Sequence, residues 1–290
     1  MGNVQGWMPA MISPFGEDGK LELGMVPDLV EFYRSHRVSG LVVGGTNGEG
    51  TSMSVAERNL LLTEVMAHRG DLTVIAGTGA ASIVDAVALT RHASDAGVDA
   101  VLTLPPFFYK NASTQGIADY FRIVMRVSKA PVLLYSIPQH TGVTVTDELL
   151  EMLSDEPNLA GLKDSRGVWE DSLKLLQRWP NLKIFMGSDE LMARGLTHGA
   201  AGCISGSANP FPDVVSAVGE AWKEGEGLDV AQAKLDAAKT ILLKYPLIAN
   251  NKTVMHLRGL KKMSVRPPLV NLTDEQRVGI EREVKDAGLV

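Results

Sequence analysis

Lys163 is the first residue whose position suggests chemistry. It follows residues 159–162 (LAGL), an apolar run typical of a buried strand. Burial disfavours the charged form of a lysine, and a neutral amine is the nucleophile that attacks carbonyl groups. We therefore expect Lys163 to form a covalent imine, a Schiff base, with a carbonyl substrate. We expect no bound cofactor for this reaction.

Candidate partners for this lysine stand at the ends of other apolar runs. Tyr135 ends residues 131–135, and residues 45–50 (GTNGEG) close the run that begins at residue 40. A phenol, with an ordinary pKa of about 10, can shuttle protons when a hydrogen-bonded relay accompanies it, and Thr46 is the expected relay. The backbone N–H groups of Thr46 and Asn47 are expected to hold the carboxylate of a 2-oxo acid. Further residues at or near strand ends are His140, Gly187 and Ile204.

Each candidate also has a purely structural explanation. Residues 45–50 can be a tight turn and nothing more, and Tyr135 can be a core tyrosine with a hydrogen-bonded hydroxyl. Lys163 can form a buried ion pair with Asp164, although adjacent strand residues point to opposite faces. Tyr109, which follows two phenylalanines, can simply pack at an interface. The joint occurrence of a lysine, a tyrosine and a glycine-rich turn at strand ends favours the chemical explanation.

These residues need a scaffold that brings strand ends together. Most of the short apolar runs are continuous rather than alternating, which is typical of parallel strands covered on both faces. The expected strands are residues 7–13, 40–45, 72–77, 98–104, 131–135, 159–163, 182–187 and 201–205. Helical periodicity separates them. The expected helices are residues 22–36, a segment that Ser54 and Glu57 begin as a capping box, a segment ending near 96, and residues 114–127, 146–154, 168–178, 189–197 and 212–224.

Eight strand–helix units in a chain of this length predict a (β/α)8 barrel, residues 1–226, with its chemistry at the C-terminal strand ends. Strand patterns then stop, and residues 227–290 are expected to form a helical extension packed on the barrel. Its expected helices are residues 228–245, 249–263 and 274–286. A doubly wound open sheet is the alternative. It is disfavoured because residues 77–82 (GTGAAS) lack the last glycine of a GxGxxG turn.

Composition narrows the partners of the chain. Its 290 residues are 45% hydrophobic and carry a net charge of −6, without a basic stripe, so neither nucleic acid nor an anionic membrane is an expected partner. The single cysteine, Cys203, allows no intrachain disulfide and fits a reducing compartment. Residues 1–7 lack the features of a signal peptide. We expect a cytoplasmic protein that acts on small molecules.

Three motifs in order resemble the dihydrodipicolinate synthase / N-acetylneuraminate lyase family of pyruvate-dependent class I aldolases. They are residues 45–49 (GTNGE), which match the family pattern G-[ST]-[TN]-G-E, residues 135–142 (YSIPQHTG), which are similar to Y-N-x-P-x-x-[ST]-G, and residues 162–165 (LKDS), which contain K-[DE]-[ST]. Residues 265–269 (VRPPL) also resemble the family. The resemblance covers essentially the whole chain.

The resemblance implies a role for each candidate. Lys163 would be the Schiff-base lysine, and Tyr135 the acid and base that works with Thr46. Tyr109 would reach into a neighbour's active site across a tight dimer, within a homotetramer built as a dimer of dimers. The backbone of Ile204 would contact the pyruvyl group.

Two departures from the family pattern bear on the substrate. Dihydrodipicolinate synthases have an arginine where this chain has His140, and that arginine binds the carboxylate of the second substrate. A histidine is a poorer carboxylate clamp than an arginine fork. Those synthases usually have threonine in place of Asn47, and Asn47 and residues 105–110 (PPFFYK) resemble the 2-keto-3-deoxy-sugar-acid and hydroxy-oxoglutarate aldolases. We favour that substrate type, with 4-hydroxy-tetrahydrodipicolinate synthase (pyruvate plus aspartate semialdehyde) and N-acetylneuraminate lyase as alternatives.

Two functions of other classes remain open. A metal-dependent barrel enzyme could use Glu49, Asp164, Asp189 and a histidine as ligands, although no metal site is expected, because only His140 stands near a strand end. A protein that binds a 2-oxo acid without turning it over is the other alternative. Asp164 and Arg166 are expected to order a loop.

Overall fold

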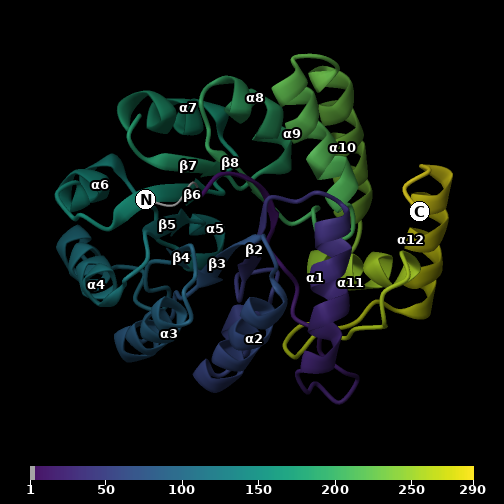
Figure 1. Ribbon diagram of the computed structural model, residues 1–290, viewed down its shortest axis with the longest axis horizontal. Coiled ribbons are helices and arrows are strands. Elements are labelled where there is room, and N and C mark those ends of the chain that lie inside the picture. The colour runs from purple at the N-terminus through teal and green to yellow at the C-terminus, as the bar shows by residue number, and fades with distance from the viewer. Residues whose placement is uncertain (1–3) are drawn as a thin grey trace.

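Eight parallel strands form a barrel in the computed structural model, which describes residues 4–290 (Figure 1). Each strand pairs with its neighbours in the order β1-β8-β7-β6-β5-β4-β3-β2. A parallel bridge between Ala10 and Val42 joins the two ends of this order, so the sheet closes on itself. The expected (β/α)8 fold is therefore confirmed, and the open doubly wound sheet is wrong. Residues 1–3 and the expectations about a signal peptide that rest on them lie outside the described part.

The strands are β1 (Gly6–Pro9), β2 (Gly40–Val43), β3 (Thr73–Gly77), β4 (Ala100–Thr103), β5 (Val132–Ser136), β6 (Leu159–Asp164), β7 (Lys183–Met186) and β8 (Gly202–Ser205). The helices around the barrel are α1 (Val26–Ser35), α2 (Val55–His68), α3 (Ile83–Asp95), α4 (Thr114–Val127), α5 (Pro138–Thr141), α6 (Asp147–Leu153), α7 (Trp169–Arg178), α8 (Met192–Thr197) and α9 (Pro212–Glu224). Three short 3-10 helices are η1 (Leu23–Met25), η2 (Gly50–Ser52) and η3 (Asp189–Leu191).

The strands divide their side chains between two apolar cores, because successive residues of a strand point to opposite faces. On β5, Val132 and Leu134 join the outer core between the strands and the helices, whereas Leu133 and Tyr135 face the core inside the barrel. Burial on both faces explains why most strands read as continuous apolar runs. The same alternation decides which residues at the strand ends can reach the barrel mouth.

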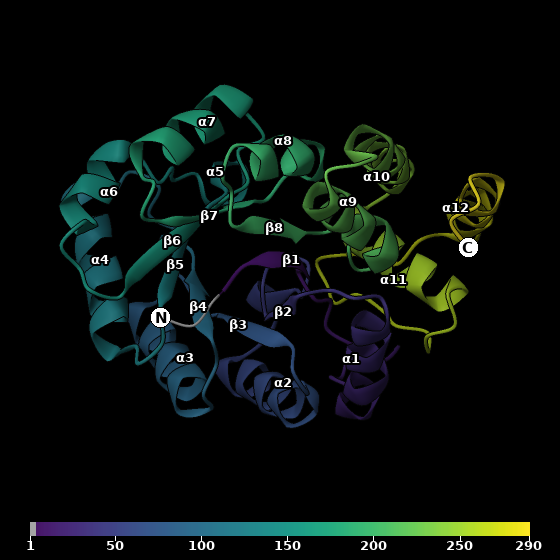
Figure 2. The ribbon, with the colours of Figure 1, turned by 45° about the horizontal axis from the view of Figure 1, so that its top comes forward.

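Three helices follow the barrel: α10 (Leu228–Leu242), α11 (Leu247–Leu257) and α12 (Asp274–Asp286). Leu235 of α10, Val254 of α11 and Ile280 of α12 are buried in the same outer core that covers the strands. The extension therefore packs on the barrel and shares its core. Figures 1 and 2 show α11 and α12 beyond α1 and α10, at the C-terminal end of the chain. The predicted boundary between barrel and extension, at residues 226 and 227, lies in the short connection between α9 and α10. This boundary stays a prediction.

The element boundaries differ from the expected ones by a few residues. The first strand ends at Pro9 instead of residue 13, because the sheet contact continues only as the bridge at Ala10. The helix expected at 249–263 ends at Leu257, and Gly259 there adopts a positive φ of 97°, a conformation that ends a helix. The short helix α5 was not expected. Of the helices in residues 4–290, none combines the length and the apolar character needed to cross a membrane.

Candidate active site

A cavity of about 650 Å³ lies at the C-terminal ends of the strands. It is lined by all but one of the predicted site residues: Thr46, Asn47, Tyr135, His140, Lys163, Gly187 and Ile204. Tyr109 is the exception. It stands in the loop after β4 with 69% of its surface exposed, packed edge-on against the equally exposed Phe108. The other predicted residues therefore meet at the strand ends, and Tyr109 is exposed and does not line the cavity.

Lys163 and Tyr135 form the centre of this cavity. They pair in register on the neighbouring strands β6 and β5, so both side chains point to the barrel interior. Lys163 Nζ donates a hydrogen bond of 3.1 Å to the Tyr135 hydroxyl, and it lies 4.2 Å from the centre of the phenol ring. Both residues are only 4% exposed. An amine and a phenol in direct contact, shielded from water, can exchange a proton without an intermediary.

The pKa of Tyr135 is lowered by its surroundings. Burial by itself raises the pKa of a phenol, because it disfavours the anion. The positive charge of Lys163 and hydrogen bonds from Ser165, Lys163 and Thr46 outweigh burial and favour the phenolate. The lowered pKa increases the ionised share of Tyr135 at a given pH, and the ionised form can act as a general base.

Asp164, the next residue of β6, points away from the cavity. Its carboxylate accepts two hydrogen bonds of 2.8 and 2.9 Å from the Arg166 guanidinium and one of 2.8 Å from Ser172. The alternative ion pair between Lys163 and Asp164 is therefore wrong, and Asp164 orders the loop after β6 as expected. At the end of β7, Gly187 donates to the Asp164 carbonyl at 2.7 Å, and Ser165 Oγ occupies the space that a side chain at Gly187 would need.

Residues 45–50 form a tightly packed turn beside the lysine. A side chain at Gly48 would come within 2.7 Å of the Met11 carbonyl, and one at Gly50 would collide with the Gly44 carbonyl. Ser13 Oγ fixes the turn further by donating to the Gly48 carbonyl at 2.5 Å. The turn presents Thr46 and Asn47 to the cavity.

Glu49 lies in this turn but points away from the cavity mouth into the protein. It is one of two non-glycine residues with positive φ (52°) in the described chain. Its buried carboxylate accepts hydrogen bonds from Lys252 Nζ of α11 at 2.5 Å and from the Arg266 backbone N–H at 2.8 Å. The sequence analysis missed Lys252. In the sequence, Lys252 could have been noticed only as a lysine among apolar residues of a predicted helix.

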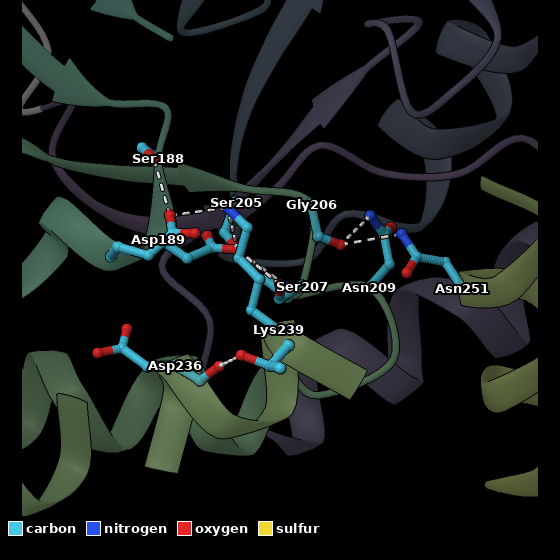
Figure 3. A network of polar contacts seen from close by, with 12 residues as sticks. Ser188, Asp189, Ser205, Gly206, Ser207, Asn209, Asp236, Lys239 and Asn251 are labelled. Atoms are coloured by element: carbon cyan, nitrogen blue, oxygen red, sulfur yellow. Dashed lines mark hydrogen bonds and ion pairs between the residues drawn. The ribbon is translucent and has the colours of Figure 1, made fainter. Parts of the chain in front are cut away.

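One wall of the cavity is polar and includes Ser188, Asp189, Ser207 and Lys239, which Figure 3 shows together. Asp189 accepts a 2.6 Å hydrogen bond from Ser207 and lies 3.6 Å from Lys239 Nζ, while its other buried carboxylate oxygen has no partner. Burial lowers the pKa of Lys239, but the negative charges of Asp189 and Glu190 outweigh it and raise that pKa, so Lys239 is a cation. The sequence analysis missed Ser207 and Lys239, and it considered Asp189 only as a metal ligand.

The carboxylates proposed for a metal site are each engaged elsewhere. Glu49 pairs with Lys252, Asp164 with Arg166, and Asp189 with Ser207 and Lys239. Within residues 4–290, no three His, Cys, Asp or Glu side chains are grouped so that they could hold a metal ion.

A smaller cavity of about 270 Å³ adjoins the site and shares Thr46, Tyr135 and His140 with it. Its walls are largely apolar, and Arg58 of α2 lies beside them. Arg58 donates to the carbonyls of Gly77 and Gly79 at 2.6 and 3.1 Å, and burial lowers its pKa to about 10. Arg58 thereby connects α2 to the end of β3, where Gly77 and Gly79 line the smaller cavity.

A lysine that is hydrogen-bonded to a tyrosine at the mouth of a (β/α)8 barrel supplies the amine nucleophile and the proton carrier of an imine-forming lyase. Comparisons with known proteins agree with that class. Residues 3–287 match the model of the "Dihydrodipicolinate synthetase family". A relative from Chloroflexus aurantiacus, described as an "Uncharacterized DapA-like lyase", is 41% identical over 95% of this chain and 94% of its own.

Two solved structures are similar over nearly their full lengths. The dihydrodipicolinate synthase of Acinetobacter baumannii, solved with pyruvate, has a TM-score of 0.92 and 28% identity, covering 99% of this chain and 100% of its own. The sialic acid aldolase of Ruminococcus gnavus, solved as wild type and as a catalytic lysine mutant, also has a TM-score of 0.92 and 28% identity, covering 99% of this chain and 98% of its own. The chain therefore belongs to the dihydrodipicolinate synthetase family. It is an enzyme, a class I pyruvate-dependent lyase.

Proposed function

We propose that this enzyme condenses pyruvate with an aldehyde, or releases pyruvate from the condensed product, through a Schiff base on Lys163. The observation that carries the proposal is the 3.1 Å hydrogen bond between Lys163 Nζ and the Tyr135 hydroxyl inside the cavity. Two similar proteins support it: the sialic acid aldolase has a catalytic lysine, and the A. baumannii synthase was solved with pyruvate.

In the proposed reaction, Tyr135 moves the protons. In its ionised form, the share of which the lowered pKa increases, Tyr135 takes a proton from Lys163, and the neutral amine attacks the ketone carbon of pyruvate to give a carbinolamine. Tyr135 returns the proton to the hydroxyl that leaves as water, and an iminium ion forms. Tyr135, an anion again after this transfer, takes a proton from the pyruvyl methyl group, and the iminium becomes the enamine. The enamine carbon attacks the aldehyde carbon, and Tyr135 gives its proton to the aldehyde oxygen, which becomes a hydroxyl. Water then hydrolyses the imine and frees Lys163.

Thr46 has two tasks in this scheme. Its hydroxyl contributes to the lowered pKa of Tyr135, so it stands where a proton relay is needed. With Asn47, it would hold the pyruvate carboxylate through backbone N–H groups. Gly187 and the backbone of Ile204 line the same cavity and would complete the pyruvyl site.

For the aldehyde, we favour a hydroxylated chain of the 2-keto-3-deoxy-sugar-acid or hydroxy-oxoglutarate type. The polar wall of the cavity offers the Ser188 and Ser207 hydroxyls and an Asp189 oxygen that lacks a donor. A buried acceptor without a partner favours a ligand that brings a hydroxyl group to it. His140, in contrast, lacks the two-pronged geometry with which arginine binds a carboxylate.

A second candidate is the condensation of pyruvate with aspartate semialdehyde, the reaction of 4-hydroxy-tetrahydrodipicolinate synthases. One observation favours it: Lys239 places a cation in the cavity, and a cation can bind the carboxylate of that aldehyde. N-acetylneuraminate cleavage is a third reaction, for which a cavity of about 650 Å³ would have room.

A substrate screen separates these reactions. Pyruvate is supplied with glyoxylate, sugar aldehydes, N-acetylmannosamine or aspartate semialdehyde, and 2-keto-3-deoxy acids are tested for cleavage, with Lys163→Ala as the blank. We expect the highest kcat/KM for hydroxylated substrates. A preference for aspartate semialdehyde would overturn the substrate assignment, and adduct formation without turnover of any aldehyde would indicate a 2-oxo-acid binder.

We further propose a homotetramer built as a dimer of dimers, in which Tyr109 completes a neighbour's site. The exposure of Phe108 and Tyr109 supports an interface at the loop after β4.

The single cysteine, which is buried, fits a protein of the cytoplasm.

A further inference from the structure

We propose that Lys252 and Glu49 form a buried strut through which α11 holds the turn at residues 45–50 in the shape that binds pyruvate. Lys252 is then a positioning residue of the active site, although it stands in the C-terminal extension. The inference rests on the proposed function, because it assigns the carboxylate of pyruvate to Thr46 and Asn47.

The strut joins two segments that are 203 residues apart in the chain. Lys252 Nζ donates to Glu49 at 2.5 Å and to the Ser264 carbonyl at 2.6 Å, and it lies 4.7 Å from the centre of the Phe15 ring. The second carboxylate oxygen of Glu49 accepts the Arg266 N–H. The two paired side chains are 1% and 0% exposed, so water does not compete for these bonds.

The position of Glu49 is transmitted to the substrate-binding residues through the backbone. Glu49 N–H donates to the Thr46 carbonyl at 3.0 Å, and the N–H of Gly50 donates to the Gly45 carbonyl at 3.1 Å. Glu49 adopts a left-handed backbone conformation that costs free energy for a residue with a side chain. Its two anchored carboxylate oxygens compensate that cost, and a turn without them would relax and move Thr46.

Charge makes each partner depend on the other. Burial lowers the pKa of Lys252, and the negative charge of Glu49 and its hydrogen bond oppose that change without cancelling it, so the ammonium form depends on Glu49. Removing one partner alone leaves an unpaired buried charge, which destabilises a fold strongly. Variants that test the strut must therefore remove both charges together or keep both.

Two variants meet this condition. The double variant Glu49→Gln, Lys252→Met is neutral and close in volume to the wild type, and Gln can still accept the Arg266 N–H. Glu49→Asp keeps both charges and shortens the carboxylate arm by one methylene. Lys262→Met is the matched control, because it breaks the exposed pair of the same C-terminal segment with Glu17, at 2.6 Å.

The measurements are hydrogen–deuterium exchange of the amides in residues 45–50 and the pyruvate concentration that gives half-maximal labelling of Lys163 with borohydride. We expect both variants to exchange faster in this turn, with unchanged exchange in the strands. We expect half-maximal labelling at a roughly ten- to a hundredfold higher pyruvate concentration, with an unchanged maximum. The control should match the wild type in both measurements.

Wild-type exchange and wild-type half-saturation in a folded Glu49→Asp or double variant would overturn the strut. If pyruvate does not label the wild type at all, the proposed function fails. In that case the hydrogen–deuterium exchange of residues 45–50 alone tests the strut: faster exchange in the two variants would support it, and wild-type exchange would overturn it.

Discussion

At the scale of single residues, the chemistry depends on one amine and one phenol that share a hydrogen bond. Neither side chain is unusual alone. Lys163 and Tyr135 meet because neighbouring parallel strands carry them at paired positions, and the barrel interior removes water from their contact. In that setting the positive charge of the lysine stabilises the phenolate, and the phenolate can take the proton of the amine.

Tyr135→Phe removes the proton carrier and keeps the ring. We expect kcat to fall by about 10²- to 10⁴-fold, which is the usual contribution of general acid–base catalysis. Steady-state kinetics measures the loss, and circular dichroism checks that the fold is intact. A folded Tyr135→Phe enzyme with wild-type kcat would assign the proton transfers to another group.

The lowered pKa of Tyr135 makes stability depend on pH. The folded protein favours the phenolate, and the unfolded chain titrates near a pKa of about 10. The contribution of Tyr135 is therefore fully present above that value and is lost as pH falls through the folded pKa. In unfolding experiments from neutral pH to about 10, wild type should gain free energy of unfolding relative to Tyr135→Phe as pH rises.

The same comparison in a Lys163→Met background serves as the control, because the lysine charge that favours the phenolate is gone. There the gain with rising pH should disappear. Parallel pH curves for wild type and Tyr135→Phe would contradict a lowered pKa at Tyr135.

Most of the site residues that were predicted from the sequence stand at or just after strand ends, whereas Tyr109 lies farther along the loop after β4 and His140 lies in α5. Strand order brings the residues at strand ends together, so their spacing along the chain was informative. Lys239 and Lys252 belong to the C-terminal helices α10 and α11, and the sequence pattern does not predict how these helices pack on the barrel. Ser207 follows β8 by two residues and could have been found from the strand order. Asp189 was identified with the wrong role, because its neighbours Ser207 and Lys239 were not known.

At the scale of elements, the C-terminal segment acts as a clamp on the start of α2. Ser54 and Glu57 form the predicted capping box, in which Ser54 Oγ accepts the Glu57 N–H and Glu57 accepts the Ser54 N–H. Arg266 adds hydrogen bonds to Glu57 and to the Ser52 carbonyl. The sequence predicted the box, which is local, and could not predict Arg266, which is 209 residues from Glu57.

Glu57 should therefore contribute to stability down to very low pH. The hydrogen bonds from Arg266 lower its pKa from 4.5 to about 2, although burial opposes them. The contribution is fully present above pH 4.5 and is lost as pH falls through about 2. Wild type should melt at a higher temperature than Glu57→Gln at and above pH 4.5. The two melting temperatures should become equal only as the pH approaches about 2.

Arg266→Met provides the check on this cause. In that background the Glu57 pKa should return towards 4.5, so most of the pH-dependent difference between Glu57 and the Glu57→Gln variant should disappear. Identical pH profiles with and without Arg266 would show that the clamp does not act through Glu57.

The elements themselves were largely predictable. Continuous apolar runs identified every strand, because each is buried on both faces, and α4, α9 and α12 have the expected bounds. Strand ends were less predictable, since the apolar run from residue 7 to 13 continues into the barrel mouth after sheet pairing stops at Pro9. The four-residue helix α5 was missed because it is too short to show a helical period.

At the scale of the whole molecule, Tyr109 is the predicted site residue that does not line the cavity of its own protomer. We expect a homotetramer, so sedimentation equilibrium should give four times the protomer mass. Tyr109→Phe should keep that mass and lower kcat by roughly tenfold or more, because a relay hydroxyl is lost from the neighbour's site. A fully active monomer, or an unchanged kcat in Tyr109→Phe, would contradict the role of Tyr109.

Reductive trapping tests the chemistry at Lys163 most directly. The enzyme is incubated with pyruvate, reduced with borohydride, digested and mapped by mass spectrometry. Lys163→Ala is the test variant. Lys183→Ala, which removes an exposed lysine at the start of the adjacent strand β7, is the matched control. We predict a reduced pyruvyl adduct on Lys163 in wild type and in Lys183→Ala, and no adduct and no turnover in Lys163→Ala. A Lys163→Ala enzyme that still turns over substrate, or an adduct on another lysine, would contradict the imine on Lys163.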